Sequence, residues 1–251
     1  MFGDTQYDVT RRVPAVPVEE CLEAIQRLVV DGKVVAAALS NETPYGVCRA
    51  GWAAQEDPTR VARPVALQNA YSLVNRTFEE SLLECCVELD VDLLAYSPLA
   101  MGLLTGKYNT VTRDQTRDDE SMTTTTTTTT TASGWEGREG RVVGRWGGGG
   151  RDRLNVLRGR YAEGETRYAA RGPLVAAVRR YSEIAWGNGM DPAVLALRWA
   201  LGRARVASLV VGVTDRGQLG TIVEACEKEG LPEEVLEAID AVHAEWPNPA
   251  P

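Results

Sequence analysis

A short segment near the middle of the chain combines a strand pattern with residues that can hold a phosphate group. Residues 91–95 form an apolar run that we expect to be a strand buried on both faces, and Pro98 ends it because proline has no N–H for the ladder. Gly102 and Gly106 then permit a tight backbone path, and Lys107 adds a cation. This layout is typical of phosphate sites in α/β proteins. Spacing alone leaves open an ordinary strand exit with a surface lysine.

Helical and strand patterns alternate on both sides of this segment, which favours parallel strands joined by crossover helices. Apolar residues recur at helical spacing after Pro17, and Gly32 is placed to stop that helix. Asp191 is expected to cap a later helix that has proline at its first position. The predicted strands cover residues 34–39, 65–67, 91–95 and 207–213. The predicted helices cover residues 18–29, 43–52, 78–89, 173–186, 192–199, 218–228 and a last segment that begins at 232.

A low-complexity segment interrupts this alternation. Residues 123–131 are nine consecutive threonines, and residues 147–150 are four consecutive glycines. Such a composition does not bury a core, so we expect residues 111–150 to be a disordered insertion between two parts of one domain, 1–110 and 151–251. The insertion is either a natural flexible loop or translated non-coding sequence. The second interpretation is favoured because the segment contains no periodic pattern.

Charge, apolar runs and cysteine spacing indicate which partners, locations and metal sites the chain is not expected to have. The net charge of −8 disfavours binding to nucleic acid or to an anionic membrane. The chain has no apolar run of membrane-spanning length and no secretory pattern at its start, so a cytoplasmic location is expected. Its five cysteines have no metal-binding spacing, which favours buried free thiols and no metal site.

The segment Tyr96-Ser97-Pro98-Leu99, followed by Leu104-Thr105-Gly106-Lys107-Tyr108, resembles the seventh-strand cofactor signature of the aldo-keto reductases. The chain is most similar to the Tas-like branch of that superfamily, whose relatives include the potassium-channel β-subunits. The resemblance covers roughly residues 14–110 and 151–251. Family enzymes are (β/α)8 barrels that reduce aldehydes and ketones with NADPH. The four predicted strands resemble strands five to eight, so the implied fold is α/β: about half a TIM barrel plus the insertion.

The resemblance also implies an NADP(H) site at the carboxyl ends of the strands. Each of its residues taken singly is equally compatible with a turn or capping role. The implied contacts are Ser40, Asn41 and Gln68 to the nicotinamide carboxamide, Tyr96 stacking on the nicotinamide, Ser97 and Leu99 to the pyrophosphate and ribose, Lys107 and Arg153 to the 2′-phosphate, and Gly212, Thr214 and Gln218 to phosphate and adenine.

Two departures from the family pattern limit these expectations. Ile222 stands where the family usually has an asparagine that reads adenine. The family's catalytic Asp, Tyr, Lys and His come from the first four strands, which have no counterpart here, so no catalytic residue is assigned. The only histidine, His243, is expected to be a surface or helix-end residue. Without a second histidine, a Ser-His-Asp hydrolase is disfavoured.

The function implied is NADPH-dependent reduction of a small carbonyl substrate, with this chain carrying the cofactor-binding half and inactive alone. One alternative is a complete reductase whose first half is missing only from this sequence. Another is a non-catalytic NADP(H)-binding or channel-β-subunit-like interaction protein. Four parallel strands also leave two open sheet edges and an apolar inner face, which favour self-association over stable folding of the chain alone.

Overall fold

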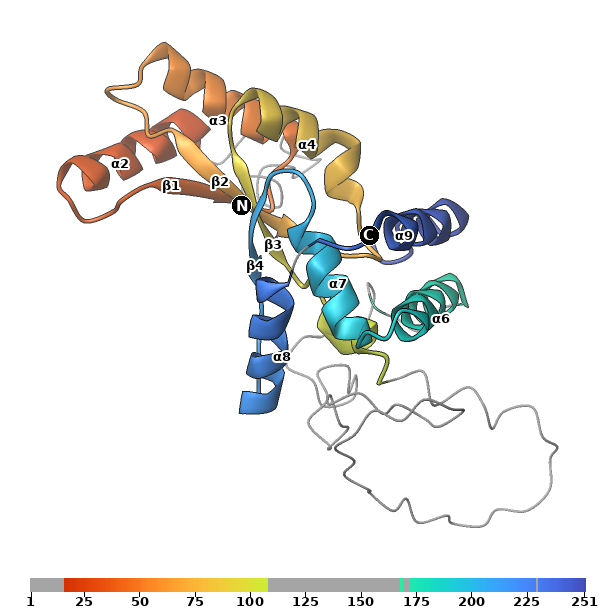
Figure 1. The fold of residues 1–251 in the computed structure, drawn as a ribbon. Helices are drawn as coiled ribbons and strands as arrows, with labels where there is room; N and C mark the ends of the chain where they lie inside the picture. Colours follow the sequence, from red (N-terminus) through yellow and green to blue (C-terminus); the bar gives the residue numbers. More distant parts are fainter. Residues whose placement is uncertain (1–15, 108–167, 169–171, 229) are drawn as a thin grey trace, which may run out of the picture.

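The computed structural model describes residues 16–107, 168, 172–228 and 230–251, and within them it contains one parallel four-stranded sheet (Figure 1). The strands lie side by side in the order in which they occur in the chain. This confirms the four predicted strands, half the number in a (β/α)8 barrel. Their bounds are β1 Ala37–Ser40, β2 Pro64–Ala70, β3 Asp92–Tyr96 and β4 Val206–Val210. The predicted insertion lies outside the described residues.

Helices follow the strands in alternation, as the sequence predicts. In the part of the chain that the structure describes, none of them has the length and hydropathy to cross a membrane. Helix α3 packs against α2 and α4, and α7 packs against α6 and α8. The bounds are α2 Val18–Val30, α3 Pro44–Glu56, α4 Thr77–Glu88, the 3-10 helix η1 Ala100–Thr105, α6 Gly172–Gly187, α7 Pro192–Leu201, α8 Arg216–Glu227 and α9 Glu233–Glu245.

The end of α2 explains why β1 starts later than predicted. Gly32 has a φ of 68°, and the N–H of Lys33 donates to the carbonyl of Leu28 at 2.9 Å. This is the Schellman pattern of a helix end, which confirms Gly32 as the helix stop. The N–H of Val34 donates to the same carbonyl at 3.3 Å. The predicted strand 34–39 is therefore wrong over its first three residues, because the chain is still tied to the helix end there.

Two other strand predictions also need correction. Strand β2 runs on past the predicted end at residue 67 because its two neighbours both pair with it: Gln68 lies between Ser40 and Leu94 in the register. Gln68 is therefore inside a strand and does not follow one. Strand β4 is shorter than predicted, so Gly212 lies in the loop beyond it.

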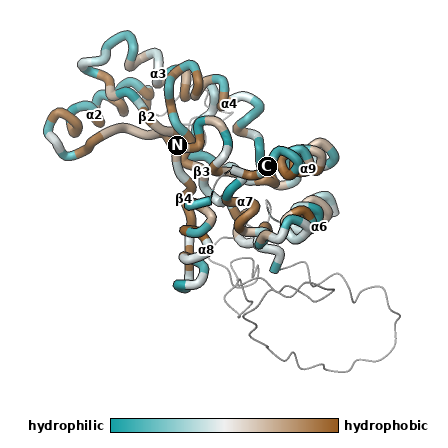
Figure 2. Tube along the Cα trace, viewed as in Figure 1, coloured by the Kyte–Doolittle hydropathy of each residue, from teal (hydrophilic) through white to brown (hydrophobic). Residues whose placement is uncertain are grey.

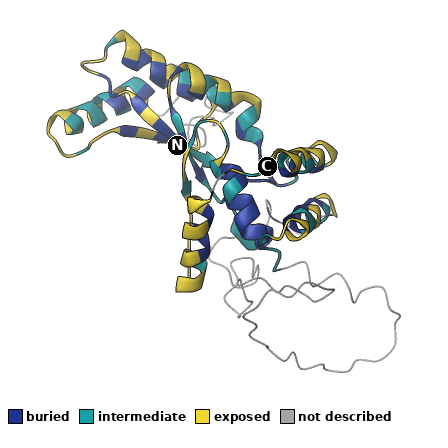
Figure 3. Cartoon of the chain, viewed as in Figure 1, coloured by how far each residue is buried: buried dark blue, intermediate teal, exposed yellow. Residues whose placement is uncertain are grey.

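Among the described residues, helices cover one face of the sheet and leave the other face without a helix over it (Figure 3). Leu39, Leu67 and Leu93 form a row across the first three strands and are only 6%, 0% and 0% exposed. The next row, on the opposite face, contains Gln68 and Leu94, which are only partly buried. The prediction that β3 is buried on both faces is therefore wrong, because the helices cover only one side. The open face is also less apolar than predicted, since its rows include Ser40, Gln68, Asp92 and Ser208.

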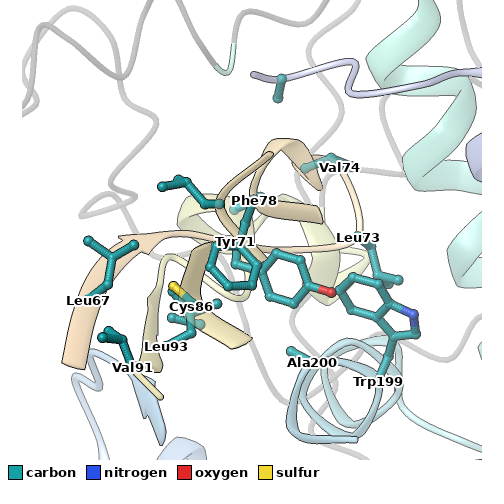
Figure 4. Packing of buried hydrophobic residues seen from close by; sticks show 14 of the residues in the cluster. Leu67, Tyr71, Leu73, Val74, Phe78, Cys86, Val91, Leu93, Trp199 and Ala200 are labelled. Carbon is teal, nitrogen blue, oxygen red and sulfur yellow. The ribbon is translucent and has the colours of Figure 1, made fainter. Parts of the chain in front are cut away.

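The core fixes the loop that follows β2 (Figure 4). Trp199 lies in α7, an apolar helix that is brown along most of its length in Figure 2. Its ring stacks on Tyr71 with centroids 5.1 Å apart, and the Arg76 guanidinium lies 4.5 Å from the Trp199 ring centroid. Arg76 Nη1 also donates to Asp240 of α9 at 2.6 Å. Burial, and then the hydrogen bond to Glu79, raises the pKa of Tyr71. These contacts anchor the carboxyl end of β2.

The five cysteines are free thiols, as predicted, but their burial differs from the prediction. Only Cys86 is fully buried, and burial raises the pKa of its thiol to about 11. Cys226 is exposed, and the other three are partly buried. The apolar patterns around these cysteines indicate the helices correctly, but they do not indicate which side of each helix a thiol occupies.

Candidate cofactor-binding site

The open face of the sheet brings together three of the predicted site residues from three adjacent strands. Ser40, the last residue of β1, pairs in register with Gln68 of β2, which in turn pairs with Leu94 of β3. Tyr96 lies two residues beyond Leu94 and therefore on the same face. Because the strands are parallel, all three residues lie toward the carboxyl edge of the sheet, where ligands bind in α/β barrels.

Asn41 joins these strand ends directly. Its N–H donates to the carbonyl of Gln68 at 2.9 Å, and its Oδ1 accepts a hydrogen bond from Tyr96 Oη at 2.8 Å. The backbone of Asn41 has a φ of 53°, a left-handed conformation that asparagine tolerates better than most residues. The hydrogen bond holds the Tyr96 ring at the edge of the sheet and leaves the NH2 group of the Asn41 amide as the group offered to a ligand.

The loop after β3 holds an unusual backbone conformation. Ser97, Ala100 and Met101 have φ values of 54°, 46° and 54°, each of which costs about 1–3 kcal/mol for a residue other than glycine. The N–H of Ala100 donates to the carbonyl of Ser97 at 2.8 Å, and η1 packs against α6 and α7. Packing therefore maintains the strain. Strained loops of this kind occur at ligand sites, and the phosphate-binding role of this loop stays a prediction.

The two glycines predicted to shape this loop adopt backbone conformations with positive φ, which glycine accepts without strain. Gly102 and Gly106 have φ values of 97° and 74°. A Cβ atom on Gly102 would lie 3.2 Å from Lys107 Cε and 3.4 Å from Nζ, so the lysine side chain folds back over Gly102. The Lys107 ammonium group therefore lies against the loop that follows β3. The second predicted cation, Arg153, lies outside the described residues.

Two of the predicted ligand residues, Thr214 and Gln218, form hydrogen bonds at the start of α8. The N–H of Thr214 donates to Gln218 Oε1 at 2.9 Å, and the N–H of Gln218 donates to Asp215 Oδ1 at 2.9 Å. These bonds cap the helix. Asp215 was not among the predicted residues, although an Asp followed three residues later by Gln is a capping signal. Gly212 lies exposed between β4 and this cap.

Two further residues of the predicted adenine and ribose region pack into the protein. Ile222 is buried with Val194 and Leu197 in the contact between α7 and α8. Leu99 is partly buried and packs against the same cluster. The Leu99 side chain is therefore structural, and its carbonyl accepts hydrogen bonds from the N–H groups of Gly102 and Leu104.

His243 lies in the last turn of α9, as predicted for a helix-end residue. It is not a simple surface residue, because it is partly buried and its Nδ1 has no hydrogen-bond partner among the described residues. Burial, and then the charge of Arg76, lowers the pKa of the imidazole.

Glu42 is a buried carboxylate beside the candidate site, and it was not predicted from the sequence. It follows Asn41, it is buried, and its Oε1 accepts a hydrogen bond from the N–H of Thr43 at 3.0 Å. Thr43 in turn caps α3 by accepting a hydrogen bond from the N–H of Gly46 at 3.2 Å. A buried carboxylate beside the Ser40-Asn41 turn therefore supports the end of β1.

Because of this packing, any side chain at position 46 is expected to destabilise the folded protein. A Cβ atom on Gly46 would overlap the buried Glu42 side chain. We expect Gly46→Ala to lower the free energy of unfolding by about 1–3 kcal/mol, measured by urea denaturation. The control is Gly220→Ala in α8, where a Cβ meets no atom within 4 Å and the helical alanine should stabilise by roughly 0.5–1 kcal/mol. Equal stabilisation by both changes would contradict the Glu42 contact.

Comparison with known proteins identifies the family of this chain. The chain belongs to the aldo/keto reductase family, whose model matches residues 7–244. It is 34% identical over 250 residues to Protein tas of Escherichia coli (strain K12), a match that covers 100% of this chain and 60% of that protein. It is 31% identical over 255 residues to an aldo-keto reductase of Babesia bovis, covering 99% and 74% of the two chains.

A third relative is named as a channel subunit and not as a reductase. The chain is 28% identical over 231 residues to a putative voltage-gated potassium channel subunit beta of Schizosaccharomyces pombe, covering 91% of this chain and 56% of that protein. The chain thus spans less than two thirds of the length of the Tas and channel-subunit relatives. This agrees with the four strands of the sheet, because a full barrel has eight.

Proposed function

We propose that this chain is the cofactor-binding half of an NADPH-dependent aldo-keto reductase that acts on small aldehydes and ketones. The observation that carries the proposal is the placement of Ser40, Gln68 and Tyr96 on one face of three adjacent strands, with Asn41 bonded to both Tyr96 and the β2 backbone. Amide groups beside a fixed aromatic ring suit a flat carboxamide-bearing ring such as nicotinamide.

Each group in this arrangement has a defined task. The face of Tyr96 stacks on the ring, while Asn41 and Gln68 hydrogen-bond its carboxamide and fix which side of the ring is presented. Lys107 supplies a charge-assisted contact to a phosphate, which is the contact that favours NADPH over NADH. When bound, NADPH supplies the hydride that reduces a carbonyl.

The carbonyl itself needs groups that the described residues do not place at the site. Reduction requires a proton donor and a polarising group at the carbonyl oxygen. The Tyr96 hydroxyl is bonded to Asn41, and the one histidine of the chain lies in α9, which packs on α6. We therefore assign binding and orientation of the cofactor to this chain, and proton transfer to residues supplied by the remainder of a barrel.

A second candidate function is that of a non-catalytic NADP(H)-binding interaction protein. Its support is the relative named as a potassium channel subunit beta. The two functions share the cofactor site and differ in turnover. Carbonyl reduction by a completed barrel supports the reductase, whereas NADPH binding without turnover supports the interaction protein.

Substitution of Tyr96 tests the proposed site. The test uses a hybrid, defined as a fusion in which the part of Escherichia coli Protein tas outside the matched segment is placed ahead of this chain. Tyr96→Ala removes the stacking surface and should weaken NADPH binding by about 1–3 kcal/mol, measured by fluorescence titration. Tyr96→Phe keeps that surface and loses only the bond to Asn41, so its effect should be smaller. Unchanged affinity in Tyr96→Ala would refute the assignment.

A further inference from the structure

Two of the five cysteines lie one helical turn from a tight contact between α3 and α4. The contact joins Gly51 of α3 to Leu89, the residue after α4. A Cβ atom on Gly51 would lie 2.7 Å from Leu89 Cδ1, so the leucine packs directly on the glycine backbone. Cys85 lies one turn before Leu89, because the N–H of Leu89 donates to the carbonyl of Cys85 at 3.0 Å. Cys48 precedes Gly51 by three residues and therefore lies on the same side of α3.

The direction of the two helices brings these cysteines face to face. Helices α3 and α4 follow the parallel strands β1 and β2, so they run in the same direction, and they pack against each other (Figure 1). The turn before Gly51 on α3 therefore lies opposite the turn before Leu89 on α4. Burial, and then the neighbouring thiol of Cys48, raises the pKa of Cys85 to about 11, which agrees with this arrangement.

The packing also suits a covalent bond between the two residues. A disulfide needs Cα atoms about 4.4–6.8 Å apart. A glycine at the contact lets two helices approach at the short end of the usual range of about 8–10 Å between axes. Each Cα lies about 2.3 Å from its axis, so facing Cα atoms come within disulfide range. Cys48 and Cys85 are both partly buried and not fully enclosed, which leaves them accessible to a small oxidant.

We propose that Cys48 and Cys85 form a reversible oxidation site, which closes to a disulfide between α3 and α4 when hydrogen peroxide reaches it. One thiol first attacks a peroxide oxygen, which gives a sulfenic acid and releases one water. The second thiol then attacks the sulfenic sulfur, which forms the S–S bond and releases a second water. The two sulfurs together lose two electrons, and the peroxide gains them.

The environment of the two thiols sets the order of these steps. Little of the Cys85 thiol is ionised at neutral pH because its pKa is raised, and the thiolate is the form that attacks peroxide. Cys48 is therefore the thiol that forms the sulfenic acid, and Cys85 is the one that closes the disulfide. Cys86 is the next residue along α4, but it is fully buried and lies on the core side of the helix.

The disulfide encloses the strand that carries part of the candidate site. Residues 48–85 become a closed loop that contains β2 and Gln68. A crosslink of this length restricts the unfolded chain, so it should raise the midpoint of thermal unfolding by roughly 5–10 °C. The shift should disappear on reduction with dithiothreitol and should be absent from Cys85→Ala.

The test oxidises the reduced full chain with hydrogen peroxide, blocks the remaining thiols with a maleimide and maps the peptides by mass spectrometry. Trypsin cuts after Lys33, Arg49, Arg76 and Lys107, so the disulfide should join peptide 34–49 to peptide 77–107. Two of the five thiols should be lost, and the product should be a single chain. Fragmentation of peptide 77–107 should then place the bond at Cys85 about tenfold or more in preference to Cys86.

The same reaction in urea is the matched control. Cys85 and Cys86 are neighbours in the sequence, so an unfolded chain gives them nearly equal access to Cys48 and the preference should vanish. Cys86→Ala and Cys226→Ala should both keep the disulfide, whereas Cys85→Ala should lose it. The ratio in the unsubstituted chain decides the matter even if a variant does not fold.

Three results would overturn the proposal. They are a native chain that bonds Cys86 as readily as Cys85, a chain that forms no internal disulfide at saturating peroxide, and crosslinks that only join separate chains through the exposed Cys226. None of these outcomes depends on whether NADPH binds.

Discussion

We expect the purified chain, mixed with NADPH and 4-nitrobenzaldehyde, to oxidise no NADPH above a control without protein. Cofactor binding alone does not polarise a carbonyl or protonate the alkoxide that forms. Among the described residues, two tyrosine hydroxyls beside strand ends are already hydrogen-bonded, since Tyr96 donates to Asn41 and Tyr71 donates to Glu79. Burial raises the pKa of Tyr71, which makes it a still weaker acid. We therefore expect the chain alone to show no turnover of the aldehyde.

The hybrid is the positive control for this result. It adds the portion of Protein tas that the chain does not match, and it should reduce the same aldehyde. Turnover by the chain alone that depends on protein concentration, and that disappears in Tyr96→Phe, would mean that Tyr96 acts as the acid and would contradict our assignment.

Lys107→Ala should discriminate between the two nicotinamide cofactors. The side chain lies against Gly102 in the loop after β3, where a phosphate is expected. Loss of one charge-assisted contact costs about 1.5–3 kcal/mol, which raises the Kd for NADPH roughly 10- to 150-fold. NADH has no 2′-phosphate, so its Kd should change little. The measurement is fluorescence titration of the hybrid with both cofactors.

The matched control is Lys33→Ala, which removes an exposed lysine paired with Asp31 at the end of α2. It changes the net charge equally and should leave both Kd values unaltered. An equal loss of NADPH and NADH affinity in Lys107→Ala would instead place this lysine at the pyrophosphate. No effect on either cofactor would remove Lys107 from the site.

The order and type of the elements were predictable because hydrophobic periodicity is a local property of the chain. Every strand and helix expected in the described residues is present, including the Asp191 cap, whose side chain accepts a hydrogen bond from the N–H of Ala193 at 2.8 Å. The bounds were less predictable because pairing sets them. Gln68 joins β2 because Ser40 and Leu94 flank it, and the one-sided burial of β3 depends on which face the helices cover.

For the candidate site, the sequence predicted which residues lie at the strand ends but did not predict the contacts between them. Family resemblance placed Tyr96 and Asn41 in it separately, but their hydrogen bond depends on the lateral order of the strands, which no spacing along the chain encodes. The burial of Glu42 was not predictable because glutamate is rarely buried, so its residue type indicates an exposed position. The cap that involves Gln218 was visible in the sequence, because Asp215 stands three residues before it.

The central claim is that this chain contains the NADP(H) site, and calorimetric titration of NADPH tests it most directly. The titration compares the hybrid, the chain alone and the separate unmatched portion of Protein tas. Our account predicts one equivalent of NADPH bound by the hybrid, weaker binding by the chain alone, and none by the unmatched portion. It also predicts loss of affinity in Tyr96→Ala in the hybrid. Binding of NADPH by the unmatched portion alone, or a correctly folded hybrid that binds none, would contradict the account.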